Sequence, residues 1–454
     1  MMISSIVFLI LLIAASLFFA VRIRLIRQNI LLGRDVDMSD NKAERWRTMA
    51  RVALGQGKMV ARPLAGVLHI FVYAGFIIIN LEVLEIVIDG IFGTHRIFYS
   101  LIGTNLYYAF IAAFEILALL VLFACVVFLI RRNIGKLKRF SGREMTLWPK
   151  TDANIILIVE CLLMLAFLTM NAADAMLMMV PDEMLAAFGA DKYSGFEFGK
   201  WFPVSAYLTG FLPLHVPTLV FVERFCWWFH IVGIFAFLVY IPYSKHLHIF
   251  LAFPNTYFSR LGPLGKFNNL ESVKREVELM LDPNADPYAA PATDAATDAA
   301  PERFGAKDAD DLSWKQLLDA YSCTECGRCT SECPANITGK ILSPRKIMMD
   351  TRDRIEELGA LKREKGNDAT DGKSLINDYI SPEELWACTT CNACAQACPV
   401  NINPLSIIID LRRYLVMEES AAPAELNTMF TNIENNGAPW QFSQNDRANW
   451  RDEA

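Results

Sequence analysis

The sequence holds little charge, and it lacks the short motifs by which enzymes bind nucleotides or activate a nucleophile. Charged residues make up 20% of the chain and hydrophobic residues 54%, a balance that excludes a single ordinary soluble domain. The chain contains no P-loop, no glycine-rich dinucleotide fingerprint and no nucleophile with a matching base. Its net charge is −6, and its basic residues crowd into residues 1–150. We therefore expect neither hydride-transfer chemistry nor nucleic acid as a partner.

Long apolar runs are what the sequence has instead. Five segments reach roughly the length of about 20 residues that crosses a bilayer. They span residues 3–26, 64–88, 106–130, 153–180 and 219–243.

The connections between these segments alternate between basic and nearly neutral. Residues 22–62 hold ten Lys or Arg and residues 131–150 hold seven, whereas residues 89–105 hold one and residues 181–218 hold two. By the positive-inside rule, the N-terminus faces outward and everything after Tyr243 faces the cytoplasm. The first segment has no basic n-region and no A-x-A cleavage site, so we expect a retained helix. The prediction is a multi-pass protein of the inner (cytoplasmic) membrane.

The chain beyond the last apolar segment divides into three further parts. Residues 1–250 form the predicted membrane part, and residues 251–311 form a connecting segment with a linker rich in Ala, Pro and Asp. Residues 312–420 show helical spacing without alternating strands, which predicts a compact helical domain. Residues 421–454 form a polar tail that we expect to be ordered only against a partner. The predicted fold is all-α: a five-helix transmembrane bundle followed by a soluble helical domain.

Eight of the eleven cysteines fall in two copies of one motif, C-x2-C-x2-C-x3-C-P, in "SCTECGRCTSECPAN" and "ACTTCNACAQACPVN". Thiolates suit soft metal centres, and this spacing wraps the chain around a 4Fe–4S cube. Three cysteines bind one cube, and the fourth ligates the other cube in two-cluster ferredoxins. The predicted first set is Cys323, Cys326, Cys329 and Cys398, and the second set is Cys388, Cys391, Cys394 and Cys333. Zinc, the alternative, would leave the third cysteine of each triplet and the proline unexplained.

The remaining cysteines and the stretch between the motifs add two points. Cys125, Cys161 and Cys226 lie in apolar runs, which argues against a disulfide framework and for a reducing compartment. A charged segment at residues 352–365 predicts a helix between the motifs. With this insert, residues 312–417 resemble the α-helical ferredoxin domain in the iron–sulfur subunits of heterodisulfide reductases, glycolate oxidases and succinate dehydrogenases. The motif is specific for the cofactor and not for the substrate.

Histidines near the ends of the apolar segments are the second group of candidate ligands, because an imidazole in hydrocarbon is usually paired, ligating or functional. His69 and His248 lie within one or two turns of the same membrane level. They predict a b-type haem between the second and fifth segments; a quinone pocket or a structural role is the alternative. His230, in the outer half of the fifth segment, is a further candidate and shares a face with His248 if the helix continues through Pro242. His246 is expected to be interfacial.

This arrangement looks like the five-helix cytochrome b subunit of respiratory nitrate reductase and of membrane-bound heterodisulfide reductase. That family often places a further histidine ten residues along the second helix, where it holds an outer haem. Here the position is Ile79. The departure speaks against a second haem, for which His230 would need His95 or His215 as its partner.

Carboxylates inside the apolar segments allow two interpretations. They could form ion pairs and hydrogen bonds within the bundle, or some could relay protons to a quinone, because quinone chemistry couples electrons to protons. The residues are Glu82, Glu85, Glu115, Glu160 and Glu223.

The tail "FTNIENNGAPWQFSQNDRANW" resembles an N-P-W-G…R-x-x-W stretch that follows the cluster domain in heterodisulfide-reductase-like iron–sulfur proteins. Here Ala438 and Gln441 replace the Asn and the Gly of that pattern. In the family, the stretch precedes a cysteine-rich domain with paired C-C-G motifs. The resemblance implies that this tail binds a soluble redox partner, either a CCG-domain protein or a flavin-containing one.

Together these features predict a membrane-anchored electron-transfer subunit of an oxidoreductase complex in a respiratory chain. Electrons would pass between the quinone pool, haem b, two 4Fe–4S clusters and a soluble partner. One alternative is a membrane acceptor for an electron-transfer flavoprotein or a 2-hydroxy-acid dehydrogenase. Another is a redox-sensing membrane anchor.

Overall fold

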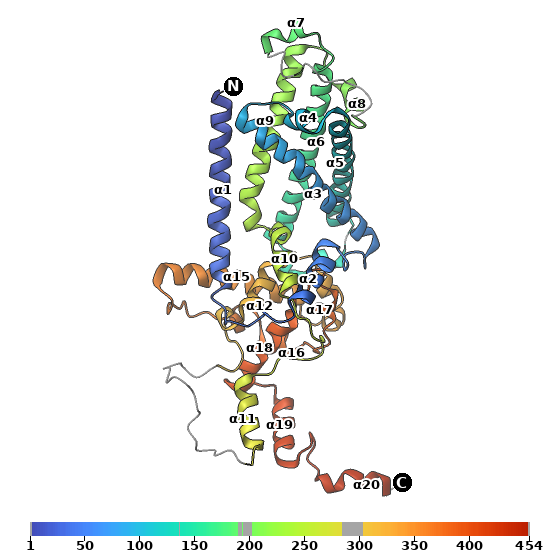
Figure 1. The fold of residues 1–454 in the computed structure, drawn as a ribbon. Coiled ribbons are helices and arrows are strands. Elements are labelled where there is room, and N and C mark those ends of the chain that lie inside the picture. Colours follow the sequence, from blue (N-terminus) through green and yellow to red (C-terminus); the bar gives the residue numbers. More distant parts are fainter. Residues whose placement is uncertain (1, 136, 189–192, 194–201, 284–302, 453–454) are drawn as a thin grey trace.

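The computed structural model describes residues 2–135, 137–188, 193, 202–283 and 303–452. Throughout these ranges the ordered elements are helices, and the only β-contacts are two isolated bridges. Long helices form a bundle, and a second group of short helices lies at one end of it (Figure 1). The predicted all-α architecture is confirmed.

Five helices are long and apolar enough to cross a membrane. They are α1 (Met2–Ile30), α3 (Pro63–Phe92), α5 (Thr104–Asn133), α6 (Trp148–Leu177) and α9 (Val216–Tyr240). Three of them carry a proline in the first turn, where its missing N–H costs no helical hydrogen bond. Each helix covers one of the five predicted segments, so the chain is a membrane protein.

The bundle is built around α5, α6 and α9, and α1 lies at its edge. α6 packs against both α5 and α9, while α3 packs against α5. α1 contacts α9 and α3, and its Phe8 ring fills the space that a side chain at Gly90 would occupy. Most of the remaining α1 surface is exposed apolar side chains, as a lipid-facing helix requires.

Short elements close the two ends of the bundle. At the far end lie α4 (Ile97–Ile102), α7 (Asp182–Leu185) and α8 (Ser205–Leu208) (Figure 1). At the other end lie α2 (Lys42–Met49), a π-helical turn (Ala50–Leu54), two 3-10 turns (Lys138–Phe140 and Arg143–Met145) and α10 (His248–Tyr257). The two basic connections therefore lie at the same end as the C-terminal helical domain.

The end of α9 differs from the expectation. The helix stops at Tyr240, followed by a 3-10 turn (Ile241–Tyr243) containing Pro242, whose ring and missing N–H break an α-helix. Ser244 then caps a further 3-10 turn, and α10 begins at His248. The condition under which His230 and His248 would share a helical face, a helix that continues through Pro242, is therefore not met. His230 lies at the middle of α9 and not in its outer half.

The cluster domain consists of short helices around one apolar core. They are α12 (Trp314–Tyr321), α13 (Arg328–Ser331), α14 (Pro334–Ile337), α15 (Pro344–Lys365), α16 (Pro382–Trp386), α17 (Ala393–Ala397) and α18 (Pro404–Met417). Capping boxes at Ser313 and Ser381 begin α12 and α16. Ile347, Ile355 and Ile407 are fully buried, which stabilises the domain by about 2 kcal/mol for each side chain. The charged segment 352–365 forms the second part of α15, as predicted.

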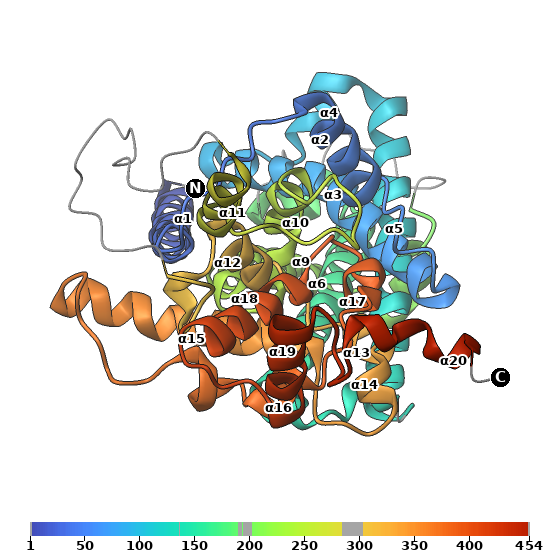
Figure 2. The same ribbon diagram turned by 90° about the horizontal axis from the view of Figure 1, so that it is seen from below.

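This domain lies directly across the end of the bundle, as the view from that end shows (Figure 2). α12 and α15 contact α1, and α12 also contacts α10. α1 thus extends beyond the membrane part and becomes one wall of the cluster domain.

The linker and the tail are the least packed parts. The segment after α10 carries α11 (Glu271–Leu281), and residues 284–302 of the predicted linker lie outside the described residues. The tail, expected to need a partner for order, forms α19 (Ala424–Asn436), a 3-10 turn (Gln444–Ala448) and α20 (Asn449–Asp452). Gly437 ends α19 in the left-handed conformation that glycine adopts without strain. α19 buries none of its side chains and lies away from the bundle (Figure 1).

Candidate metal centre

The two cysteine motifs fold into the same backbone turn. The second residue after the first cysteine has a positive φ in both, 52° at Glu325 and 56° at Thr390. The fourth has one as well, 70° at Gly327 and 61° at Asn392. A β-branched threonine in this region is strained, at a cost on the order of 1–3 kcal/mol, and such strain gathers at functional sites. The repeated spacing therefore produces a repeated, strained loop that turns its cysteines inward.

The first set brings together cysteines that are far apart in the sequence. Cys323, Cys326, Cys329 and Cys398 all line one small cavity. The pKa of the Cys398 thiol is raised to about 12, chiefly by burial and also by the neighbouring Cys326 and Cys323. The last cysteine of the second motif thus lies with the first three of the first motif.

The second set shows the reciprocal arrangement. The pKa of Cys394 is raised to about 12, chiefly by burial and also by Cys388, Cys333 and Cys391. α13 of the first motif packs against α17 of the second, which carries Cys333 across. Cys391 is exposed to solvent, whereas Cys323, Cys333, Cys394 and Cys398 are buried.

Backbone donors and a cation support the sulfur atoms. The Ile402 N–H donates to Cys398 Sγ over 3.3 Å, and the Thr390 N–H donates to Cys388 Sγ over 3.4 Å. Arg412 donates to the Cys388 carbonyl over 2.6 Å. Such donors stabilise negatively charged thiolates and tune the centre they bind. In the described ranges, no three Cys, His, Asp or Glu side chains converge closely enough to hold a single metal ion.

The loop between α2 and α3 contacts the first set directly. Lys58 Nζ donates to the Cys398 carbonyl over 3.3 Å. In return, Arg328 donates to the Lys58 and Met59 carbonyls over 3.0 and 3.3 Å. Sequence reasoning counted Lys58 only as a positive-inside residue, because no local pattern signals that a loop 340 residues away will meet it.

The α5–α6 connection contacts the same region through a buried ion pair. Arg345, fully buried, donates to Glu144 over 2.6 Å and to the Arg139 carbonyl over 2.6 Å. Burial opposes ionisation of Glu144, but Arg345 and the Ser343 hydroxyl outweigh it and hold the Glu144 pKa below its ordinary value. Both basic connections therefore contact the cluster domain and form the surface on which it packs.

Lys245 joins the first cysteine loop to the end of α9. Its ammonium pairs with Glu325, which also accepts from Arg352 over 2.9 Å. Its backbone N–H donates to Asp152 over 3.1 Å. His246 and His248, which follow Lys245, lie at the same junction.

Three histidines gather at this end of the bundle. His248 Nδ1 donates to the Lys245 carbonyl over 2.9 Å, which leaves Nε2 as the free acceptor. His246 lies with its ring centroid 5.6 Å from that of His248, and burial together with His248 and His69 lowers its pKa to about 3. His69 Nδ1 is buried without a hydrogen-bond partner in the described part of the chain. The structure thus brings His69 and His248 together and adds His246, for which the sequence indicated an interfacial position.

His230 stands apart from this group. It is 2% exposed, and its Nδ1 donates to the Leu163 carbonyl over 3.0 Å. The two outer histidines have other partners: His95 pairs with Asp174 at 3.3 Å, and His215 contacts the Thr218 hydroxyl at 2.9 Å.

A buried polar network fills the far end of the bundle. Arg96 donates to Asp174 over 2.6 Å and to Asn171 over 2.9 Å, and Asn171 donates to Glu115 over 3.2 Å. Glu82 is 3% exposed, and its Oε2 has no hydrogen-bond partner in the described ranges. Hydrogen bonds within the bundle hold Glu85 and Glu115, and Glu223 pairs with Arg224. Nothing in the sequence signals that Arg96 would be buried in this network, because Arg96 lies in a connection between two apolar segments.

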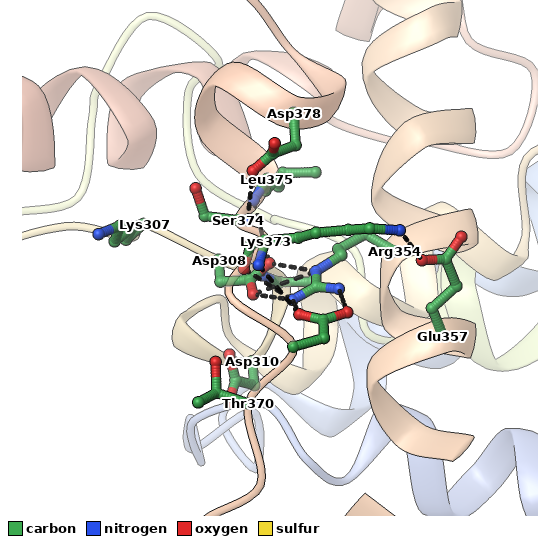
Figure 3. Close-up of polar contacts among 12 residues, drawn as sticks. Lys307, Asp308, Asp310, Arg354, Glu357, Thr370, Lys373, Ser374, Leu375 and Asp378 are labelled. Carbon is green, nitrogen blue, oxygen red and sulfur yellow. Dashed lines mark hydrogen bonds and ion pairs between the residues drawn. The ribbon is translucent and has the colours of Figure 1, made fainter. Parts of the chain in front are cut away.

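A second polar cluster ties down the insert between the two motifs (Figure 3). Arg354, 1% exposed, pairs with Asp308 over 2.6 Å and with Asp371 over 2.8 Å. Arg354 lies on α15, Asp308 precedes α12, and Asp371 follows α15. Arg354 and Asp308 line a polar cleft that contains none of the motif cysteines. The three residues hold the insert between the motifs against the domain, and we call them the insert clamp.

Comparison with known proteins supports the assignment of the cysteine region. Residues 322–402 match the 4Fe–4S dicluster domain family, and this range includes all eight motif cysteines. No solved structure matches the chain.

Relatives cover the membrane part as well. The chain is 30% identical over 459 residues to the "Probable iron-sulfur-binding oxidoreductase FadF" of Bacillus subtilis (strain 168), covering 94% of this chain and 57% of the relative. It is 27% identical over 446 residues to the EtfAB:quinone oxidoreductase of Syntrophomonas wolfei, covering 93% and 56%. One component of the dihydromethanophenazine:CoB–CoM heterodisulfide reductase of Methanosarcina mazei is 29% identical over 147 residues, covering 32% and 35%.

The chain thus spans little more than half the length of the first two relatives. These homologues are iron–sulfur oxidoreductases, in agreement with the predicted iron–sulfur resemblance.

Proposed function

We propose that this chain is a membrane-anchored electron-transfer subunit that passes electrons between the quinone pool and a soluble redox partner through two 4Fe–4S clusters. The observation that carries the proposal is the crossed pair of cysteine sets, one of them held against a membrane bundle. We divide the chain into a membrane domain (residues 1–250), a connecting segment (251–311), a cluster domain (312–420) and a docking tail (421–454).

Two four-cysteine sets are the proposed ligands of the two clusters. Cys323, Cys326, Cys329 and Cys398 would hold the first, and Cys388, Cys391, Cys394 and Cys333 would hold the second. The donor chemistry fits, because each set offers four thiols with backbone N–H donors at a ligand sulfur. Such a cluster, when bound, accepts and releases single electrons. The polypeptide positions the thiolates, limits access by water and supplies nearby charge.

The histidines at the cluster end fit one b-type haem. The Nδ1 of His248 is held by the Lys245 carbonyl, so its Nε2 has the fixed orientation expected of an axial ligand. The orphaned Nδ1 of His69 marks a buried imidazole that needs a partner. We assign His69 and His248 as the axial pair and keep a quinone pocket as the alternative. His230 is a weaker candidate, because His95, one of its two possible partners, is paired with Asp174.

The basic connections support an orientation with the cluster domain in the cytoplasm. Both connections lie at the end of the bundle that carries this domain, and cytoplasmic loops are enriched in Lys and Arg. The soluble partner would then be a cytoplasmic protein.

An electron-transfer flavoprotein is the partner that the comparisons favour. The similarity to the EtfAB:quinone oxidoreductase extends over 93% of this chain, including the membrane part. A cysteine-rich CCG-domain protein is the second candidate, on the similarity to a heterodisulfide reductase component over 32% of the chain.

The proposal is tested by a reduced-minus-oxidised visible spectrum of the purified protein, with iron, acid-labile sulfide and haem assayed on the same sample. We expect about eight irons, two cubes of four, and about one b-type haem per chain. Eight irons without haem, in folded protein expressed with a haem supply, would reassign His69 and His248 to a quinone pocket. About four irons or fewer in fully loaded protein would remove the two-cluster proposal.

A further inference from the structure

The first cysteine set is surrounded by positive charge that the membrane domain delivers. Lys58, from the loop before α3, reaches the Cys398 carbonyl over 3.3 Å. Arg139, from the α5–α6 connection, lies against the turn of the first motif. A side-chain carbon added at Gly327, between Cys326 and Arg328, would be 3.3 Å from Arg139 Cβ.

These two cations have little else to neutralise them. Arg139 Nε is buried without a hydrogen-bond partner in the described part of the chain. Lys58 is partly buried, and the polar contact given for its ammonium is the Cys398 carbonyl. By contrast, the Glu325 carboxylate beside Cys323 is paired with Lys245 and Arg352.

The second set has different surroundings. Its cation is Arg412 of α18, which belongs to the cluster domain and donates to the Cys388 carbonyl. The other hydrogen bonds to its cysteines in the described chain come from residues of the same domain, such as Thr390. Cys391 is exposed, so water supplies much of the charge stabilisation there.

From this asymmetry we propose that Lys58 and Arg139 are positioning residues that raise the reduction potential of the cluster held by the first set. Reduction adds one negative charge to a cluster, and a cation in a partly buried site stabilises that charge more strongly than in water. Burial of the first set opposes its reduction, and the two cations offset that cost. The inference rests on the proposed function, since it requires both clusters to be present.

The consequence is a coupling between docking and electron distribution. The two cations reach the first set only when the cluster domain lies against the bundle, as it does here. When the cluster domain lies against the bundle, an electron that is exchanged between the two clusters therefore favours the cluster of the first set.

The test is a redox titration of the full-length protein in lipid nanodiscs, with the two clusters followed by electron paramagnetic resonance. The variant Lys58→Gln with Arg139→Gln removes both charges but leaves the backbone carbonyls that Arg328 and Arg345 bind. We expect one of the two reduction steps to move to lower potential by at least a tenfold change in its equilibrium constant, about 59 mV for one electron. Arg412→Gln should move the other step.

Two controls separate charge from structure. Lys58→Arg with Arg139→Lys keeps both charges and should leave both steps unmoved, and so should Lys42→Gln at an exposed position of α2. Unmoved steps in the double Gln variant, or equal shifts of both steps at full signal intensity, would overturn the inference. Fewer than two cluster signals in the unmodified protein would instead overturn the proposed function, and the inference with it.

Discussion

The two cysteine sets share a spacing and a backbone turn, yet the protein surrounds them differently. The first set is contacted by Lys58 and lies beside Arg139, residues of the membrane domain, while the second set is contacted by Arg412 of its own domain. The second set also contains the exposed Cys391. The duplicated motif therefore lies in two environments, one against the bundle and the other reached by solvent at Cys391.

Under the proposed function, this difference indicates which end of the electron path each set would serve. A cluster with an exposed ligand would face the soluble partner, whereas a cluster held against the bundle would face the membrane part. The basic connections, which a topology rule explains by their side of the membrane, also form the surface on which the cluster domain packs. The predictions below test the comparison, from the largest expected effect to the smallest.

Removing the fourth cysteine of either motif should remove the opposite cluster. Cys398→Ser should abolish the cluster of the first set and Cys333→Ser that of the second, each with loss of about half of the iron and acid-labile sulfide. Cys125→Ser, in α5, is the matched control and should keep the full iron content. If each variant lost the cluster of its own motif, as judged by which reduction step disappears, the crossed assignment would be wrong.

Removing a histidine beside the first set should remove the haem without affecting either cluster. His69→Met should lose most of the b-type α-band while the iron–sulfur signals persist, because the imidazole is a proposed axial ligand. His230→Met should retain the band. Visible spectra and haem assays on the two variants decide this, and an unchanged band in the His69 variant would contradict the assignment.

The packing of the cluster domain against the bundle should depend on the buried ion pair between Arg345 and Glu144. Glu144→Gln leaves the fully buried Arg345 without its counter-ion and should lower the free energy of unfolding by about 3 kcal/mol. Glu356→Gln, in the more exposed Arg22–Glu356 pair that also joins the two domains, should cost less than about 1 kcal/mol. Denaturant unfolding in detergent measures both, and equal losses would show that burial is not what distinguishes these contacts.

The insert clamp should respond to pH without affecting either cysteine set. Hydrogen bonding from Arg354 lowers the pKa of Asp371 to about 2 from its ordinary 3.8. The contribution of this carboxylate to stability is therefore complete above about pH 4 and is lost as the pH falls toward 2. Hydrogen exchange of residues 366–375 should accelerate over this range, and Asp371→Asn should abolish the dependence. A change in either cluster potential in Asp371→Asn would mean that the clamp is not independent of the sites.

Much of this arrangement could be predicted from the sequence, because it follows from local patterns. The five apolar segments predict five helices, and the spacing of the cysteines predicts a crossing that agrees with the placement of Cys398 beside Cys323. The shared face of His230 and His248 depended on a helix that continues through Pro242, and the α-helix ends at Tyr240 instead. The contacts of Lys58 and Arg345 escaped prediction because they join segments hundreds of residues apart and depend on how two domains pack.

The central claim is that the first set lies between the membrane and the second set, and cluster-deficient variants test it most directly. Each variant would be reduced with dithionite in liposomes, freed of reductant and mixed with a long-chain menaquinone confined to the bilayer, with freeze-quench electron paramagnetic resonance as the readout. We predict that Cys333→Ser, which keeps the first cluster, is reoxidised rapidly, and that Cys398→Ser, which keeps the second, stays reduced. Rapid reoxidation of the second cluster in the absence of the first would contradict the account.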